Sequence, residues 1–176
     1  MNAGGAAGEP RIPPVDAPDD EQRELLAKTL IGPDGRPLHV FSTLVRHPRL
    51  LRRVNALGGL FMAHGSLTDR EREIVVLRTA LQSGSDYEWA QHVPIAHRAG
   101  LSDDEIEAIR GNDGGGDPLV RAVDELHDDG EVGDATWDAL AERYDENQLL
   151  ELLFLVGFYR MLAGYLRSVR VRLEGL

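Results

Sequence analysis

Apolar residues recur along most of the chain at the spacing of three to four positions that places them on one side of a helix. Leu119, Val120, Val123 and Leu126 show this pattern clearly, and no segment has the strict alternation of a half-buried strand. The sequence therefore predicts an all-α fold, a bundle of about seven to eight helices without a sheet. The expected helices, two of them short, span residues 19–30, 39–45, 48–64, 69–82, 86–99, 103–110, 117–128, 134–144 and 146–172.

Three of these helices begin at a serine or threonine that is followed three positions later by a glutamate, which is the pattern of a capping box. The residues at the three starts are Thr68, Ser85 and Ser102. In a capping box the hydroxyl accepts a hydrogen bond from the backbone of the third helical residue, whose side chain accepts one in return. One interpretation of Glu88 is therefore that it closes the box at Ser85.

The first 17 residues are rich in glycine, alanine and proline and show no helical periodicity. Such a segment cannot bury an apolar face, so we expect a flexible N-terminal arm over residues 1–17 and a single helical domain over residues 18–176. The arm has neither the basic nor the apolar region of a signal peptide. The uncharged stretch Leu152–Tyr159 is far shorter than the roughly 20 residues that cross a bilayer. We therefore expect a cytoplasmic protein with no membrane partner.

The segment 149–162 is apolar nearly all round, which is typical of a helix buried in a core or in a contact between subunits. Gly157 and Gly164 lie on one side of this helix, where they would let another helix approach closely. Two interpretations stay open, namely the centre of a monomeric bundle and the interface of a homo-oligomer.

Glu73 lies in the middle of the apolar face of the helix predicted at residues 69–82, whereas Arg72 and Arg78 project onto the opposite, solvated face. A buried carboxylate without a partner is costly, so Glu73 must be protonated, hydrogen-bonded or paired. One interpretation is a structural ion pair with Arg70, one turn earlier. The other is a general acid whose pKa is raised by burial.

Glu88 and His92 stand four residues apart on the apolar side of the next predicted helix, so their side chains lie on the same face. If this face meets that of Glu73, three ionisable side chains converge where solvent is partly excluded. Such surroundings perturb pKa values and favour proton transfer. A lone histidine at this place is more often an ordinary core residue. The combination of Glu73, Glu88 and His92 on apolar faces is what favours a functional site. The set has one histidine and lacks a metal-binding spacing, so a metal is not expected.

The chain has 30 acidic and 19 basic side chains, a formal net charge of −11, and no cysteine. The lack of cysteine excludes disulfides, iron–sulfur clusters and a thiol nucleophile. The negative charge disfavours nucleic acid as a partner, because that binding depends on Lys and Arg neutralising phosphates. Residues 101–146 hold 16 acids and three arginines, whereas the rest of the chain carries a net charge of +2. The overall charge therefore does not exclude an anionic substrate at the predicted site.

Three segments around this site resemble the carboxymuconolactone decarboxylase family, whose members have an AhpD-like fold. They are Asp69–Ala80 (DREREIVVLRTA), Ser85–Ala96 (SDYEWAQHVPIA) and Ala99–Ile106 (AGLSDDEI). The AhpD branch of this family uses a glutamate, a Cys-x-x-Cys pair and a histidine as a thiol peroxidase site. The resemblance puts the glutamate at Glu73 and the histidine at His92, with Ser85 and Glu88 at the cysteine positions. Thiol peroxidase activity of the AhpD type is therefore not expected.

The other branch, similar to γ-carboxymuconolactone decarboxylase, needs no cofactor and acts on a lactone of aromatic catabolism. The resemblance implies a lyase or related proton-transfer enzyme for a small carboxylated lactone, assembled as a homotrimer or homohexamer. It implies Glu73, Glu88 and His92 as catalytic residues, with Glu73 or His92 as the proton donor and Glu88 orienting His92. The expected substrate-binding residues are Ser85, Trp89 and Arg70. Two alternatives stay open: binding of a small apolar acid without catalysis, and a structural role as an oligomeric partner.

Overall fold

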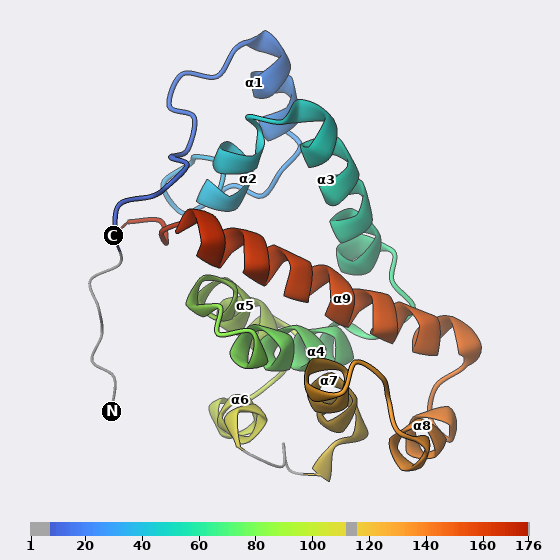
Figure 1. Cartoon of the computed structure of the whole chain (residues 1–176). Helices are drawn as coiled ribbons and strands as arrows, with labels where there is room; N and C mark the ends of the chain where they lie inside the picture. The colour runs from blue at the N-terminus through green and yellow to red at the C-terminus, as the bar shows by residue number, and fades with distance from the viewer. Residues whose placement is uncertain (1–7, 112–115, 176) are drawn as a thin grey trace. The chain divides into compact units, whose positions relative to one another are not determined.

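The computed structural model describes residues 8–111 and 116–175. These residues form nine α-helices and, apart from an isolated bridge between Ile31 and Pro37, contain no β-structure (Figure 1). The predicted all-α class is confirmed. The nine ranges expected from the sequence each contain one of these helices, so it is the predicted total of about seven to eight that is too low. The helices are α1 (Asp20–Leu26), α2 (His39–Leu44), α3 (Pro48–Ala63), α4 (Asp69–Gln82), α5 (Asp86–Arg98), α6 (Asp103–Arg110), α7 (Pro118–Asp128), α8 (Asp134–Ala141) and α9 (Glu146–Val169).

The chain groups into two compact units. The terminal unit comprises residues 1–59 and 165–176, and the central unit comprises residues 60–164. The division falls within α3 and α9, so each of these helices contributes residues to both units. The expected arm over residues 1–17 and the single domain over residues 18–176 stay predictions, and residues 1–7 of that arm lie outside the described residues.

The terminal unit has a small apolar core. Its buried members come from α1, α2, the residue that follows α2, and α3: Leu26, Leu44, Val45 and Leu51. The described part of the N-terminal segment is hydrogen-bonded to this unit, since the Val15 amide donates to the Ser42 carbonyl at 2.8 Å and the Arg11 amide donates to the Val169 carbonyl at 2.9 Å. These bonds hold residues 8–17 against α2 and the end of α9.

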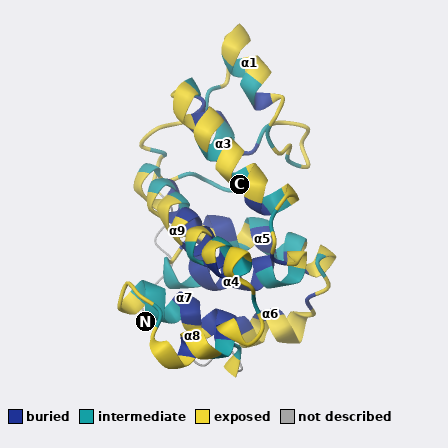
Figure 2. Cartoon of the chain, turned by 90° about the vertical axis from the view of Figure 1, so that its right-hand side faces the viewer, coloured by how far each residue is buried: buried dark blue, intermediate teal, exposed yellow. Residues whose placement is uncertain are grey.

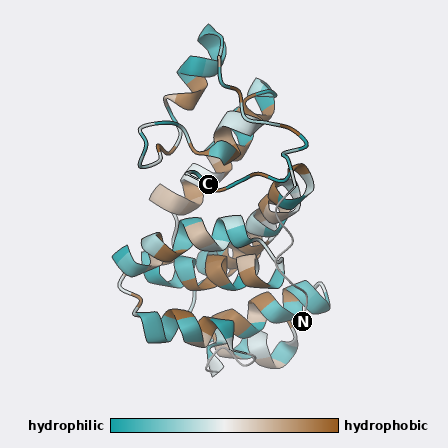
Figure 3. Cartoon of the chain, turned by 90° about the vertical axis from the view of Figure 1, so that its left-hand side faces the viewer, coloured by the Kyte–Doolittle hydropathy of each residue, from teal (hydrophilic) through white to brown (hydrophobic). Residues whose placement is uncertain are grey.

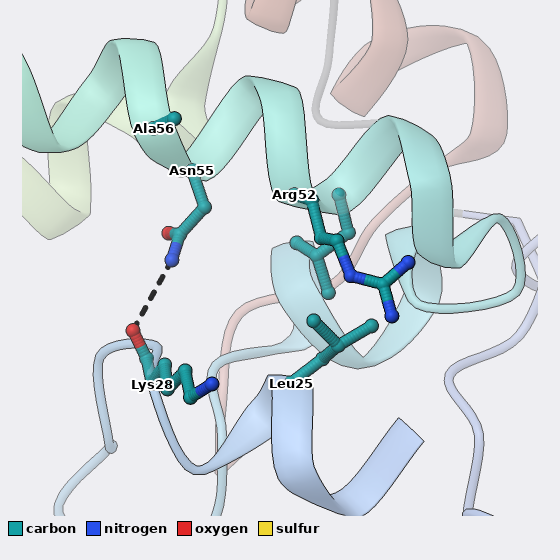
Figure 4. Close-up of a pocket in the computed structure, with 6 residues that line it drawn as sticks. Leu25, Lys28, Arg52, Asn55 and Ala56 are labelled. Carbon is teal, nitrogen blue, oxygen red and sulfur yellow. Dashed lines mark hydrogen bonds between the residues drawn. The ribbon is translucent and has the colours of Figure 1, made fainter. Parts of the chain in front are cut away.

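A cavity of about 280 Å³ opens in the terminal unit beside α1 and α3 (Figure 4). At its edge the Asn55 amide donates a hydrogen bond to the Lys28 carbonyl at 3.1 Å, and Arg52 pairs with Glu21 at 2.5 Å. None of the residues predicted to form the functional site lies in it. The cavity is lined by Leu25, Lys28, Leu51, Arg52, Asn55 and Ala56.

α4 forms the centre of the central unit and is buried without interruption from Arg72 to Ala80 (Figure 2). It packs against α5, α6 and α7. A helix that is surrounded in this way has no solvated face, so the prediction that Arg72 and Arg78 lie on one was wrong. Most other helices are amphipathic, and hydrophilic and hydrophobic positions alternate along their ribbons (Figure 3).

The buried Arg78 links α4 to α7 and to the C-terminal end of α6. Its Nε and Nη2 donate to the two carboxylate oxygens of Asp124 at 2.6 and 2.7 Å. Its Nη1 donates to the carbonyls of Ile109 and Gly111 at 2.7 and 2.8 Å. The guanidinium thus satisfies carbonyls that the end of α6 leaves without a helical partner, and its bidentate carboxylate pair offsets the cost of burying its charge.

The capping boxes at Thr68 and Ser102 form as predicted, each with reciprocal bonds to the glutamate three residues later. The box predicted at Ser85 does not form, and that prediction was wrong. The backbone of Ser85 has ψ 87°, whereas ψ is 155° at Thr68 and 166° at Ser102, so the Ser85 hydroxyl is not positioned over the first turn of α5. The Glu88 side chain is instead buried in the central unit.

α9 is long and apolar enough to cross a membrane by length and composition, a test that the core helix of a soluble protein also passes. In the structure, 44% of its most apolar 18-residue window is buried. Three large apolar side chains remain exposed along one side of the helix: Leu150, Phe154 and Met161. Gly157 lies between the last two of them and faces open space. One side of α9 is therefore core, and the opposite side is an exposed apolar stripe.

Replacing Arg78 with alanine is expected to lower the free energy of unfolding by about 3–5 kcal/mol, because Asp124 and the end of α6 lose a buried charged partner. Chemical denaturation followed by circular dichroism measures this change. Arg121→Ala, at an exposed position of α7, is the control and should change stability by less than about 0.5 kcal/mol. Equal stability of the two variants would contradict the role of Arg78.

Candidate active site

A buried hydrogen bond joins α4 to α5. His92 Nδ1 lies 2.7 Å from Glu73 Oε2, and Glu73 has no exposed surface. A carboxylate in this position accepts the Nδ1–H proton, so the neutral imidazole presents Nε2 as an acceptor. Nε2 has no hydrogen-bond partner among the described residues, and a tenth of the His92 side chain remains exposed. The carboxylate therefore orients the ring and leaves its second nitrogen able to take or give a proton.

Arg72 holds the other oxygen of the Glu73 carboxylate. Its Nε donates to Glu73 Oε1 at 3.0 Å, and its Nη1 donates to Asp69 Oδ1 at 2.7 Å. Burial alone would lower the pKa of the Arg72 guanidinium, but the two carboxylate partners outweigh burial and raise that pKa above its ordinary value. Arg72, Glu73 and His92 thus form one buried chain of charge-assisted hydrogen bonds.

Arg70 does not belong to this chain of hydrogen bonds. Its guanidinium pairs with Glu105 and donates to the Gly100 carbonyl at 3.0 Å. The predicted ion pair between Arg70 and Glu73 was therefore wrong. An i, i+3 spacing permits a contact but does not require it, and Arg70, at the exposed start of α4, reaches α6 instead.

Tyr159 of α9 packs against the imidazole from within the same unit. The edge of one ring meets the face of the other, with the His92 and Tyr159 centroids 5.0 Å apart at 88°. The Tyr159 hydroxyl contacts Met62 Sδ at 3.6 Å. Burial, together with the nearby charges of Glu73 and Glu88, raises the pKa of Tyr159 above its ordinary value. Tyr159 is thus a neutral phenol that limits how the His92 ring can turn.

Ser85 and Glu88 bring unpaired polar atoms to the same face of α5 as His92. Ser85 Oγ and both carboxyl oxygens of Glu88 are buried without a hydrogen-bond partner among the described residues. Burial raises the pKa of Glu88 to about 7, although the neighbouring Ser85 hydroxyl opposes the shift. Near neutral pH a large share of Glu88 therefore carries its proton.

Glu88 does not orient His92, contrary to the prediction, because Glu73 already occupies Nδ1. Trp89 is half-buried, and the guanidinium of Arg110 lies over its ring, 4.2 Å from the centroid. The expected roles of Ser85 and Trp89 in binding a substrate stay predictions. Of the six predicted residues, the structure joins Glu73 to His92 directly, while Glu88 lies one turn before His92 on α5 and Ser85 is the N-cap residue of that helix.

Two residues of the site were missed in the sequence. Arg72 was assigned to a solvated face because the helical projection assumed that only one side of residues 69–82 is buried. Tyr159 carries a signal that could have found it, since its hydroxyl is a polar group in the nearly all-apolar segment 149–162. Its contact with His92 depends on the packing of α9 and cannot be read from the sequence.

The arrangement has the parts needed for acid–base chemistry. His92 is oriented by a buried carboxylate, and Glu88 supplies a carboxyl group that titrates near neutral pH. Among the described residues, no group of three His, Cys, Asp or Glu side chains could hold a metal ion. The groups present can therefore move a proton and donate hydrogen bonds.

The described residues thus form an all-α protein with a buried hydrogen bond between a glutamate and a histidine. Residues 48–123 match the model of the carboxymuconolactone decarboxylase family. The match covers fewer than half of the 176 residues, and it agrees with the resemblance that the sequence motifs indicated. No curated protein matches the sequence.

Solved structures with this fold extend over nearly the whole chain. An uncharacterized peroxidase-related protein from Silicibacter sp. TM1040 is 14% identical, with a TM-score of 0.76 over 98% of this chain and 96% of its own. An alkylhydroperoxidase AhpD core protein from Ralstonia eutropha JMP134 is 18% identical, with a TM-score of 0.75 over 93% of each chain. The debrominase Bmp8 is 15% identical, with a TM-score of 0.69 over 93% of this chain and 92% of its own. At these identities the likeness shows the AhpD-like fold alone.

Glu88 makes the stability of the protein depend on pH. Its pKa is near 4.5 in the unfolded chain and about 7 in the folded protein, so the folded state binds more protons between these values. The stability contributed by Glu88 is therefore complete below about pH 4.5 and is lost as the pH rises toward 7. Glu88→Gln should remove this loss, a gain of at most roughly 3 kcal/mol at pH 8 relative to the native protein. Urea denaturation between pH 5 and 8 tests this, and parallel pH profiles for the two proteins would contradict it.

Proposed function

We propose that this protein is a cofactor-free enzyme that transfers protons at carbon in a small lactone or related product of aromatic catabolism. The observation that carries the proposal is the buried hydrogen bond between Glu73 and His92, which leaves Nε2 without a protein partner among the described residues. Decarboxylation of a carboxylated lactone is the reaction implied by the family match over residues 48–123. We also propose a cytoplasmic location.

His92 is the group that exchanges the proton with the substrate. Both oxygens of Glu73 are engaged, one by Arg72 and one by His92, which supports a positioning role for Glu73 rather than a role as the proton donor. When Nε2 takes a proton, the Glu73 carboxylate stabilises the resulting imidazolium. Arg72 keeps that carboxylate in place.

In the decarboxylation, the bond between the carboxylate carbon and the ring breaks and carbon dioxide leaves. The bonding electron pair moves into the conjugated lactone and gives an enolate. Protonated His92 then delivers its proton to the γ carbon, and the neutral imidazole returns. The cycle needs one proton from water to restore the imidazolium and no oxidant or reductant.

Thiol chemistry does not enter this proposal. The chain has no cysteine, and the AhpD-type cysteine positions correspond to Ser85 and Glu88. The peroxidase-related and debrominase names belong to the neighbouring structures. A protein that binds a small apolar acid without turning it over would use the same residues, and measurement of proton exchange distinguishes the two functions.

Proton transfer can be measured as exchange of substrate hydrogens in heavy water. A β,γ-unsaturated γ-lactone, which has acidic hydrogens next to its carbonyl, is followed by NMR with and without the protein. His92→Gln should lower the exchange rate by about 10²–10⁴-fold, and Glu73→Gln should also lower it because the imidazolium loses its stabilising charge.

His97→Gln is the matched control, because His97 is an exposed histidine of the same helix. It should exchange protons at the native rate. Circular dichroism establishes that each variant is folded. An exchange rate in folded His92→Gln equal to that of the native protein would refute the assignment, and no exchange by the native protein would favour binding without catalysis.

We also propose that the protein is a homotrimer or homohexamer in which the exposed stripe of α9 lies in a subunit contact. Phe154 is 66% exposed, and Leu150 and Met161 continue the stripe on either side. Large apolar side chains gathered on one exposed face mark interaction surfaces more often than free surface. Gly157, which faces open space, lets a partner helix approach closely.

Sedimentation velocity in detergent-free buffer tests the subunit contact. The native protein should sediment as a trimer or hexamer at micromolar concentration, and Phe154→Glu should shift it toward the monomer because a charge would be buried in the contact. Trp137→Glu, which places the same charge at an exposed position of α8, should leave the assembly unchanged. A native monomer would refute the oligomer, and aggregation reversed only by detergent would point to a lipid-facing helix.

A further inference from the structure

The face of α5 that carries His92 holds three buried oxygen atoms with no hydrogen-bond partner among the described residues. They are Ser85 Oγ and the two carboxyl oxygens of Glu88. Ser85 is 2% exposed and Glu88 is 4% exposed, so bulk solvent does not compensate them. Buried polar atoms in proteins are nearly always paired, and unpaired ones next to a reactive side chain indicate a place where a ligand supplies the missing bonds.

The ionisable groups around these oxygens provide no spare positive charge, since the imidazole of His92 is itself paired with Glu73. Burial raises the pKa of Glu88 and the Ser85 hydroxyl lowers it, and no cation contributes to the shift. The charge of Arg72 lowers the pKa of the adjacent Tyr159, but the Arg72 guanidinium is already paired with Asp69 and Glu73. A ligand carboxylate at this place would therefore meet the Glu88 carboxyl group with no unpaired cation of the described residues between them.

Building on the proton-transfer function proposed above, we propose that Ser85 and Glu88 form a receptor for an uncharged oxygen of the substrate. The receptor selects lactone, amide or ketone carbonyls over carboxylates of the same shape. If the substrate has a carboxylate, that group lies outside the receptor.

The hydrogen-bonding capacity of the two side chains fits this selection. The Ser85 hydroxyl can donate to a carbonyl oxygen, and so can the acid form of Glu88. The raised pKa of Glu88 keeps much of this acid form present near neutral pH. A carboxylate ligand would instead force Glu88 to stay protonated or would be repelled by it.

The receptor also explains how a proton can leave carbon in this site. His92 Nε2 removes a proton from the carbon next to the carbonyl, and the C–H electron pair moves onto the carbonyl oxygen. The enolate oxygen that forms is held by the hydroxyl groups of Ser85 and Glu88, whose hydrogen bonds strengthen as its charge develops. His92 then returns the proton to the γ carbon, so a β,γ-unsaturated lactone becomes its α,β-unsaturated isomer without any further reactant.

Binding of a matched pair of ligands, furan-2-carboxamide and furan-2-carboxylate, tests the receptor by titration calorimetry at pH 7.5. The two ligands have nearly the same shape and differ in charge. The native protein should bind the carboxamide at least tenfold more tightly than the carboxylate. Glu88→Gln should bring the two affinities within about threefold, because the carboxylate no longer meets a carboxyl group. Ser85→Ala should weaken carboxamide binding several-fold.

Asp86→Asn is the matched control, since it removes a negative charge from the exposed neighbour of Ser85 without altering the receptor. It should keep the native preference. Equal binding of the two ligands, tighter binding of the carboxylate, or no carboxamide binding up to about 10 mM would overturn the receptor. An equal loss of preference in Asp86→Asn would do the same, because the preference would then come from general charge.

The receptor and the proton-transfer function can fail separately. If the carboxamide preference holds and depends on Glu88 while the native protein exchanges no lactone protons, the receptor stands and the catalytic function fails. If lactone protons exchange and depend on His92 while the carboxylate binds as tightly as the carboxamide, the function stands and the receptor is refuted.

Discussion

The central unit depends on satisfying one buried charge, the carboxylate of Glu73. A carboxylate with no exposed surface is stable only if each of its oxygens has a partner. Arg72 engages one oxygen and His92 engages the other, while Asp69 fixes the far end of Arg72. The register between α4 and α5 follows from this requirement, and so does the orientation of the imidazole.

The same requirement accounts for the contrast between the two buried carboxyl groups of the site. Glu73 is compensated by an arginine and a histidine, whereas Glu88 has no partner among the described residues and responds through its pKa. Two buried carboxyl groups of the central unit thus acquire different chemical characters, one as an orienting anion and one as a proton-carrying acid. Arg78, like Glu73, is a buried charge whose polar atoms have partners, namely Asp124 and two backbone carbonyls.

Helical periodicity was enough to place Glu73, Glu88 and His92 on inner faces of their helices, but it did not predict that Glu73 rather than Glu88 holds the histidine. Glu73 and His92 each lie on an apolar face of their own helix, and helices that are neighbours in sequence usually pack those faces together. The same projection failed for Arg72, because it treats the side opposite the apolar face as solvated. It also failed for Arg70 and for the box at Ser85, where sequence spacing permits a contact that the backbone and the neighbouring helices do not provide.

The sequence by itself determined the all-α class, two of the three capping boxes, the lack of a cysteine nucleophile and the inward placement of Glu73 and His92 on their helices. These features depend on local geometry or on residue types that are present or missing. Only the tertiary structure decided that α4 is buried on all sides, that Arg72 rather than Arg70 pairs with Glu73, and that Glu88 has no partner among the described residues. These features depend on which helices surround a side chain. Burial and the available hydrogen-bond partners set the free-energy cost of a charged group, and neither can be read from the residue spacing of one helix.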